Sequence, residues 1–297
     1  MDTFVGYCSV DLVDEHNDVT FPMAVMYPTF MHGKSENLGR YIMDLAKDAE
    51  PKEGIYPLVI ISHGSGGSHL AYWTLAHHLA RNGFIVGMPE HPGNNRNDNS
   101  LMNKVDNLVN RPWHVTVAIN WFFTSRKFAG LQKPDSVAII GHSMGGYTAL
   151  AVAGGVPASF PRESTDGNSR QINVTPDRRV MALVLLAPAS YWFREEGALK
   201  GVDVPILMLT GEKDEYMPYP YNHARIILDG VPDRTKVRCR IVKNAGHFSF
   251  LSPFPESMTD ADFPPSQDPP GFNREKFLHE MNGEVLDFLL YETQVNN

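Results

Sequence analysis

The chain has 297 residues, of which 42% are hydrophobic and 20% charged, a composition typical of a globular protein. Its formal net charge of −8 argues against a general affinity for nucleic acid or for an anionic membrane surface. No apolar run is long enough to cross a bilayer, and the first residues lack the features of a signal peptide. The two cysteines, Cys8 and Cys239, are too few for a disulfide framework. We therefore expect a cytoplasmic protein in which both thiols are buried in strands.

Strands are predicted where short apolar runs are rich in β-branched residues, and helices where longer amphipathic or alanine-rich segments follow them. The first two strands, Phe4–Val13 and Phe21–Tyr27, are expected to pair antiparallel. From residue 56 onward strands and helices alternate, which is typical of a mostly parallel sheet. The later predicted strands are Tyr56–Ser62, Phe84–Pro89, Ser136–Gly141, Met181–Ala187, Pro205–Thr210 and Val237–Val242; the predicted helices are Leu70–Asn82, Pro112–Phe128, Met144–Gly154, Tyr219–Leu228 and Asn273–Tyr291.

This order of elements predicts one α/β domain over residues 1–297, with a mostly parallel sheet of about eight strands and helices on both faces. The segment 187–205 is too short to hold a large cap domain. Three polar loops, at 93–100, 156–179 and 251–271, interrupt the alternation. Long loops of this kind act as lids or binding loops in some proteins and as plain surface excursions in others, and the sequence leaves both roles open.

The segment Gly141-His142-Ser143-Met144-Gly145 fits the pattern G-x-S-x-G. A β-branched apolar run precedes it and a run of small residues follows it, so Ser143 is expected on a sharp turn between a strand and a helix. Glycines permit such a turn, and the serine then projects from the carboxyl end of the strand. We interpret Ser143 as a nucleophile.

A serine hydroxyl needs a base, and the base needs a carboxylate that orients it. Asp214 follows the predicted strand 205–210, and His247 follows the strand 237–242, so both are expected on the same edge of the sheet as Ser143. Asp214 is preferred over Glu212 and Glu215 because it lies in a G-x-x-D turn. Of the other histidines, those at 77, 78 and 223 are assigned to helices, and at position 142 the backbone is expected to matter more than the imidazole.

A glycine-rich loop, His63-Gly64-Ser65-Gly66-Gly67, follows the strong strand 56–62. In this position the loop is expected to supply one backbone N–H to an oxyanion, with the second from the residue after the nucleophile. The predicted oxyanion hole therefore consists of the amides of Ser65 and Met144. The loop matches neither phosphate-binding glycine motif, and no Cys/His cluster has zinc-ligand spacing, so we expect no cofactor and no metal.

Aromatic residues near these segments are candidates for lining an apolar pocket for the acyl group. They are equally compatible with core packing, and the sequence leaves the choice open. The candidates are Trp73, Tyr147, Tyr191, Trp192 and Phe248.

The loop 251–271 begins shortly after His247 and holds six prolines and four acidic residues, with no Lys or Arg. A negative edge at the site disfavours anionic ligands. The composition therefore predicts substrates that are neutral or positively charged, provided that the loop lies at the site and does not fold away from it.

The chain resembles an α/β-hydrolase over essentially its whole length. Within that superfamily it is similar to the dienelactone-hydrolase-like and platelet-activating-factor-acetylhydrolase-like group. The resemblance is carried by the segments 21–29, 62–67, 89–94 and 111–113 and by the three segments that contain Ser143, Asp214 and His247. It implies a serine hydrolase that works without a cofactor. Dienelactone hydrolases themselves use cysteine where this chain has Ser143, so the named substrates of the group are not carried over.

The leading hypothesis is a carboxylic-ester hydrolase that works through an acyl-enzyme, with an ester, lactone or thioester of a small molecule as substrate. Hydrolysis of an amide in a small metabolite or a peptide-type bond, and acyl transfer to an alcohol or amine, use the same machinery and remain alternatives. A non-catalytic binding protein on this fold is disfavoured, because a binding module has no need of the nucleophile, base and oxyanion loop together. The sequence predicts neither the oligomeric state nor the substrate.

Overall fold

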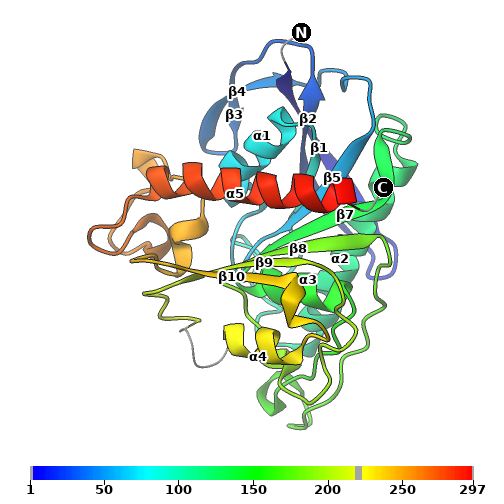
Figure 1. The fold of residues 1–297 in the computed structure, drawn as a ribbon, viewed down its shortest axis with the longest axis vertical. Helices are drawn as coiled ribbons and strands as arrows, with labels where there is room; N and C mark the ends of the chain where they lie inside the picture. The colour runs from blue at the N-terminus through cyan, green and yellow to red at the C-terminus, as the bar shows by residue number, and fades with distance from the viewer. Residues whose placement is uncertain (1–2, 218–222, 296–297) are drawn as a thin grey trace.

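The computed structural model describes residues 3–217 and 223–295 of the chain. Its sheet has ten strands, two more than the predicted eight, in the order β10-β9-β8-β7-β5-β6-β2-β1-β4-β3 (Figure 1). The six strands from β10 to β6 run parallel, and β2 pairs antiparallel with both β6 and β1. The strands are β1 (Phe4–Asp14), β2 (Val19–Thr29), β3 (Lys34–Leu38), β4 (Tyr41–Lys47), β5 (Tyr56–Ser62), β6 (Ile85–Pro89), β7 (Gln132–His142), β8 (Val180–Leu186), β9 (Ile206–Gly211) and β10 (Val237–Val242).

The two additional strands, β3 and β4, form an antiparallel hairpin at the edge of the sheet next to β1. Leu38 pairs with Tyr41, so the turn has two residues, and Gly39 adopts the positive φ of 62° that such turns require. In β4 buried residues alternate with exposed ones, from Tyr41 to Leu45. This alternation is not visible in the sequence of β4, because the exposed Ile42 is apolar like its buried neighbours, so the strand was not predicted.

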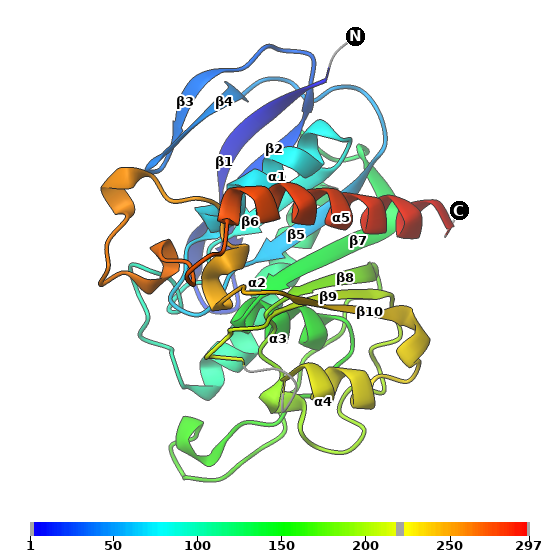
Figure 2. The same ribbon diagram turned by 60° about the vertical axis from the view of Figure 1, so that its left-hand side comes forward.

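Helices cover both faces of the sheet, because alternate residues of each buried strand point to opposite faces. Val59 and Ile61 of β5 pack under α1 and α5, whereas Leu58 and Ile60 pack under α2, α3 and α4. Figures 1 and 2 show these two layers on either side of the sheet. The helices are α1 (Trp73–Arg81), α2 (Val105–Thr124), α3 (Met144–Val152), α4 (His223–Gly230) and α5 (Arg274–Val295).

Helix α2 begins at Val105, seven residues before the predicted start at Pro112. Proline has no N–H and is favoured in the first helical turn, which led the prediction to place the start there. Inside α2, Pro112 leaves the carbonyl of Leu108 without its usual N–H donor. The hydroxyl of Tyr147 on α3 donates to that carbonyl at 2.9 Å. A tertiary contact thus compensates for the proline and joins α2 to the helix that follows Ser143.

Two further predictions, on one helix and on the two cysteines, are met only in part. The predicted helix Tyr219–Leu228 is present as α4 from His223, and its first four residues lie outside the described part of the chain. Cys8 is buried as expected, but Cys239 is exposed. Cys239 lies on β10, which is the outermost strand of the sheet and is largely uncovered. The prediction of two buried thiols was therefore wrong for Cys239.

Within the described residues, no helix is both long and apolar enough to span a membrane. The same residues contain no group of three or more His, Cys, Asp or Glu side chains arranged to hold a metal ion.

Candidate active site

Ser143 occupies the junction between β7 and α3 with φ of 53° and ψ of −117°. A non-glycine residue with positive φ is strained and persists only where its surroundings hold it. Its N–H donates to Leu186 O at 3.0 Å, and its carbonyl accepts from Ala189 N at 2.9 Å, so the end of β8 holds the turn on both sides. The geometry is that of a serine presented at the carboxyl edge of the sheet.

The two glycines of the motif are required by close backbone contacts. A Cβ on Gly141 would lie 2.2 Å from Gly145 O, and a Cβ on Gly145 would lie 1.9 Å from Ser62 O. Real Cβ atoms do not approach other atoms this closely, so any side chain at either position would displace β5 or the turn itself. The sequence pattern G-x-S-x-G therefore has a steric cause in this fold.

Asp214 and His247, predicted to act together, are in contact. The Oδ2 atom of Asp214 lies 2.9 Å from Nδ1 of His247, and both side chains are almost fully buried. The other carboxylate oxygen, Oδ1, accepts the backbone N–H groups of Tyr216 at 2.9 Å and Met217 at 2.7 Å. Burial raises the pKa of Asp214, but the hydrogen bond and the charge of His247 together with these two N–H groups more than offset it, so that the pKa is lowered.

The two rival carboxylates are both exposed. Glu212 accepts the backbone N–H of Asn244 at 2.8 Å, which turns its carboxylate toward the loop before His247 and not to the imidazole. Within the described residues, only Asp214 places a carboxylate oxygen within hydrogen-bond distance of the His247 ring.

The hydroxyl of Ser143 makes no hydrogen bond to any residue in the described ranges 3–217 and 223–295. Hydrogen bonds between a nucleophile and its base are often long in an unliganded enzyme and shorten when the substrate binds. The two residues are nevertheless joined through the neighbour of Ser143. The imidazole Nε2 of His142 lies 2.9 Å from the backbone carbonyl of His247, and the two rings are 4.9 Å apart.

The contacts of the His142 imidazole differ from the expectation that the backbone matters more than the side chain at this position. Since a carbonyl can only accept, Nε2 donates to His247 O, and Nδ1 accepts the hydroxyl of Tyr72 at 2.9 Å. Burial lowers the pKa of His142 to about 3, so the ring is neutral and keeps this tautomer. The side chain thus connects the turn at Ser143 directly to the loop that carries His247. The two segments are 105 residues apart, and no local sequence pattern indicates this contact.

The two amides predicted to form the oxyanion hole are free of partners within the described residues. Neither the N–H of Ser65 nor that of Met144 donates to another described residue, and Met144 opens α3, where N–H groups lack intrahelical acceptors. A Cβ built on Gly64 would lie 3.3 Å from the Cβ of Ser143, which places the glycine-rich loop directly against the serine. The arrangement suits an anion held between the loop and the start of α3.

The aromatic candidates lie in different surroundings, and only some of them are close to His247. Phe248 lies beside His247, with ring centroids 5.0 Å apart. Tyr216, which was not predicted from the sequence, contacts both rings, with its centroid 5.0 Å from that of His247 and 5.3 Å from that of Phe248, and it is 56% exposed. Tyr191 packs on the ring of His223.

Tyr147 is fully buried and its hydroxyl donates to the carbonyl of Leu108, so it packs in the core, which is the second of the two roles that the sequence left open. Trp73 is half-buried and packs on Tyr41 of β4. Trp192 contacts Tyr147 and donates its Nε1 to the buried carboxylate of Glu163 at 3.0 Å. Since Glu163 belongs to the loop 156–179, this bond fastens that loop to the body of the protein.

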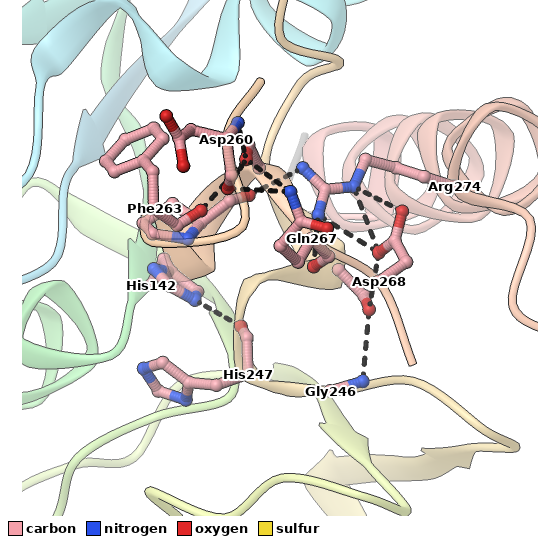
Figure 3. A network of polar contacts seen from close by, with 11 residues as sticks. His142, Gly246, His247, Asp260, Phe263, Gln267, Asp268 and Arg274 are labelled. Carbon is pink, nitrogen blue, oxygen red and sulfur yellow. Dashed lines mark hydrogen bonds and ion pairs between the residues drawn. The ribbon is translucent and has the colours of Figure 1, made fainter. Parts of the chain in front are cut away.

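The acidic loop 251–271 returns to the site at its far end. A Cβ on Gly246 would lie 3.1 Å from Pro269, and the hydroxyl of Ser249 lies 3.2 Å from the Asp268 carboxylate. Figure 3 shows Arg274 paired with Asp268 beside the segment of Gly246 and His247. Of the four loop carboxylates expected to make a negative edge, Asp268 is thus paired with Arg274 at the start of α5.

A chain of buried histidines lies beneath the glycine-rich loop. Nε2 of His91 lies 2.9 Å from the Ser62 hydroxyl, and its Nδ1 lies 3.3 Å from Nδ1 of His114. The backbone N–H of His91 donates to Nε2 of His63 at 3.1 Å. Burial lowers the pKa of all three rings, in the case of His114 to about 4. These histidines are therefore neutral in the folded protein at neutral pH.

We expect the free energy of unfolding to fall steeply in mild acid. A histidine in the unfolded chain takes up a proton near pH 6.5, whereas His114 does so only at about 4 and His142 at about 3 when folded. Between these values the unfolded chain binds more protons, so stability decreases as the pH falls through this window. The combined loss between about pH 7 and about pH 5 is on the order of several kcal/mol. Urea unfolding at the two pH values measures it, and equal or greater stability at the lower pH would contradict the prediction.

The family model of the α/β hydrolase fold matches residues 57–162, which include β5, the glycine-rich loop and the turn at Ser143. With the sheet order and the turn at Ser143, this match shows the α/β-hydrolase fold, as the resemblance implied. Among solved structures it is similar to a ferulic acid esterase from Streptomyces cinnamoneus, with a TM-score of 0.70 and 19% identity over 96% of this chain and 89% of that one. No curated protein matches the sequence.

Proposed function

We propose that this protein is a serine hydrolase that cleaves a carboxylic ester of a small molecule through an acyl-enzyme. The observation that carries the proposal is the buried pair of Asp214 and His247, 2.9 Å apart, on the same edge of the sheet as the strained Ser143. A hydroxyl nucleophile, an imidazole base and a carboxylate that orients it are the minimum for acyl transfer through serine. The similarity in fold to a ferulic acid esterase supports an ester as the substrate.

In the proposed mechanism Ser143 Oγ attacks the ester carbonyl while Nε2 of His247 takes the hydroxyl proton. Asp214 accepts the N–H at Nδ1 and stabilises the imidazolium that forms. The amides of Ser65 and Met144 hold the negative charge on the former carbonyl oxygen. The C–O bond to the alcohol then breaks, and His247 gives its proton to the leaving oxygen. Water repeats the sequence on the acyl-enzyme and releases the acid.

The test of this function is a reaction with a fluorophosphonate probe followed by a screen of esters, lactones, thioesters and amides. In a working serine hydrolase, Ser143 Oγ bonds to the phosphorus of the probe and fluoride leaves. The labelled peptide then contains residue 143. Hydrolysis of the esters at a higher kcat/KM than the matched amides supports the esterase; the reverse order favours the amidase alternative. A protein that takes no label and cleaves nothing in the panel is not a serine hydrolase.

We also expect exposed carboxylates near the site to bias it against anionic substrates. Glu256, Asp260 and Asp262 are exposed on the loop that begins after His247, whereas Asp268 is paired with Arg274. Changing the three exposed residues to their amides should raise kcat/KM for an anionic ester relative to its neutral isostere by a factor of roughly two to five at low salt, and added salt should reduce the difference.

The control for this experiment is the amide variant of Glu195 and Glu196, two residues on the segment after β8. It removes a similar charge from another part of the surface and should leave the substrate ratio unchanged. A triple variant with the wild-type ratio at low salt would show that the loop carboxylates do not face the substrate.

The resemblance to the dienelactone-hydrolase-like and platelet-activating-factor-acetylhydrolase-like group, the single-domain organisation and the cytoplasmic location stay predictions from the sequence. The proposed mechanism needs no metal or cofactor, because serine, histidine, aspartate and backbone amides supply every group that it uses.

A further inference from the structure

Arg111 of α2 is fully buried, yet no described carboxylate accepts a hydrogen bond from it. Its guanidinium donates to four neutral acceptors. They are Thr148 Oγ1 at 3.1 Å, Asn94 Oδ1 at 2.8 Å, Ser62 Oγ at 3.3 Å and the backbone carbonyl of His63. Burial lowers the pKa of Arg111 to about 9, which leaves the group positively charged at neutral pH.

A buried cation without an anion is an expensive feature. Removing an ion from water costs several kcal/mol, and hydrogen bonds to neutral groups recover only part of that cost. An apolar side chain of the same length would fill the same space without the penalty. We therefore expect Arg111 to have a role that an apolar side chain could not fulfil.

The contacts of Arg111 lead to both residues of the proposed oxyanion hole. Asn94, which accepts from Arg111, donates its Nδ2 to the Ser65 hydroxyl at 2.8 Å. Thr148, which also accepts from Arg111, donates its hydroxyl to the carbonyl of Met144 at 3.0 Å. One planar guanidinium thus connects the loop after β5 with the first turn of α3.

The contact with His63 acts on the loop itself. In a trans peptide the carbonyl and the following N–H point in opposite directions. Because Arg111 binds His63 O, the N–H of Gly64 points away from the guanidinium. The loop backbone is thus held at Gly64, where an added Cβ would lie 3.3 Å from the Cβ of Ser143.

We propose that Arg111 is a positioning residue that sets the oxyanion hole, holding the Ser65 and Met144 amides at a fixed separation and placing an uncompensated positive charge beneath them. This inference rests on the proposed function. An oxyanion hole acts through donors that are already in place when negative charge develops, and a nearby cation in a water-free environment adds to the same effect. Lysine does not replace the arginine, since it lacks the fork that reaches acceptors on three sides.

Two variants test the proposal. Arg111→Met removes both the charge and the fork. Asn94→Asp keeps the shape of the side chain, gives Arg111 a carboxylate partner and removes the N–H donor to Ser65. We expect each to lower kcat by roughly 10²-fold while KM changes less than about threefold, because the loss falls on the transition state. The Asn94→Asp protein should have a stability close to that of the wild type, since pairing a buried charge offsets the loss of the hydrogen bond from Asn94 Nδ2 to Asn99 Oδ1 at 2.6 Å.

A trifluoromethyl ketone with the acyl group of the best ester distinguishes positioning from a structural role. Ser143 Oγ adds to its carbonyl, the proton passes to His247, and the resulting hemiketal carries the oxyanion. If Arg111 sets the oxyanion hole, the inhibition constant rises in each variant by the same factor as kcat/KM falls. The end point of fluorophosphonate labelling should stay at one per chain, with a slower rate. A structural defect would instead lower the end point and leave the remaining sites at the wild-type rate.

The matched control is Arg179→Met. Arg179 lies just before β8, at the edge of the sheet opposite Ser143, and donates to Asp177 and Asn120. Its loss should leave kcat and the inhibition constant unchanged.

The proposal is overturned if Asn94→Asp keeps kcat and the inhibition constant within threefold of wild type, and this variant decides alone if Arg111→Met does not fold. A wild-type protein that never reacts with fluorophosphonate would overturn the proposed function as well. Fast labelling of both wild type and variants would overturn only the role of Arg111.

Discussion

Replacing Ser143 with alanine is expected to lower kcat by roughly 10³-fold or more while the protein keeps its fold. The side chain is the only part of the residue that changes, and its hydroxyl makes no hydrogen bond to another described residue. The turn itself is held by the backbone bonds to Leu186 and Ala189, which alanine retains. Some rate above the uncatalysed reaction should remain, because substrate binding and the oxyanion amides are still present.

Steady-state kinetics on the best ester measure this effect, with thermal unfolding as the check on folding. Ser125→Ala provides the matched control, since Ser125 ends α2 at the far edge of the sheet and its hydroxyl accepts only the N–H of Lys127. Activity within a few-fold of wild type in Ser143→Ala would exclude the serine mechanism altogether. Loss of activity in both serine variants would point to unfolding or to a damaged preparation.

The parts of the fold that could be predicted from sequence are those in which local pattern and tertiary environment agree. The runs at 56–62 and 137–140 are apolar on both faces because helices cover both faces of the sheet. The hairpin of β3 and β4 was missed because β3 is mostly polar, and because the exposed apolar Ile42 hides the alternation of buried and exposed residues in β4. The early start of α2 was missed because the rule against proline inside helices holds only when nothing else satisfies the freed carbonyl, and here Tyr147 does so.

The same distinction holds at the site. Ser143, Asp214 and His247 could be proposed from the sequence because each follows a strand that is recognisable by itself, and parallel strands bring their carboxyl ends to one edge. His142, Arg111 and Tyr216 were not found as functional residues. Each acts through a partner far away in the chain, and no spacing rule connects Arg111 with Asn94 or His142 with the carbonyl of His247. A buried cation and a tethering imidazole are recognised only once their neighbours are known.

Replacing Asp214 with asparagine is expected to lower kcat by about 10⁴-fold. The orientation of the new amide is dictated by the backbone. Oδ1 of Asp214 accepts the N–H groups of Tyr216 and Met217, and an asparagine must keep its carbonyl oxygen there. Its NH₂ group then faces Nδ1 of His247 and donates to it, which moves the imidazole proton to Nε2.

With the proton on Nε2, His247 presents a donor to Ser143 and no longer acts as a base. The change is one of tautomer, so the fold and KM should be little affected while kcat collapses. Glu212→Gln and Glu215→Gln are the matched controls and should retain activity, because both carboxylates are exposed and Glu212 is bound to Asn244. If either glutamine variant loses more activity than Asp214→Asn, the carboxylate that orients His247 during catalysis is not the one that contacts it in the unliganded protein, and the proposed triad would have to be redrawn around that glutamate.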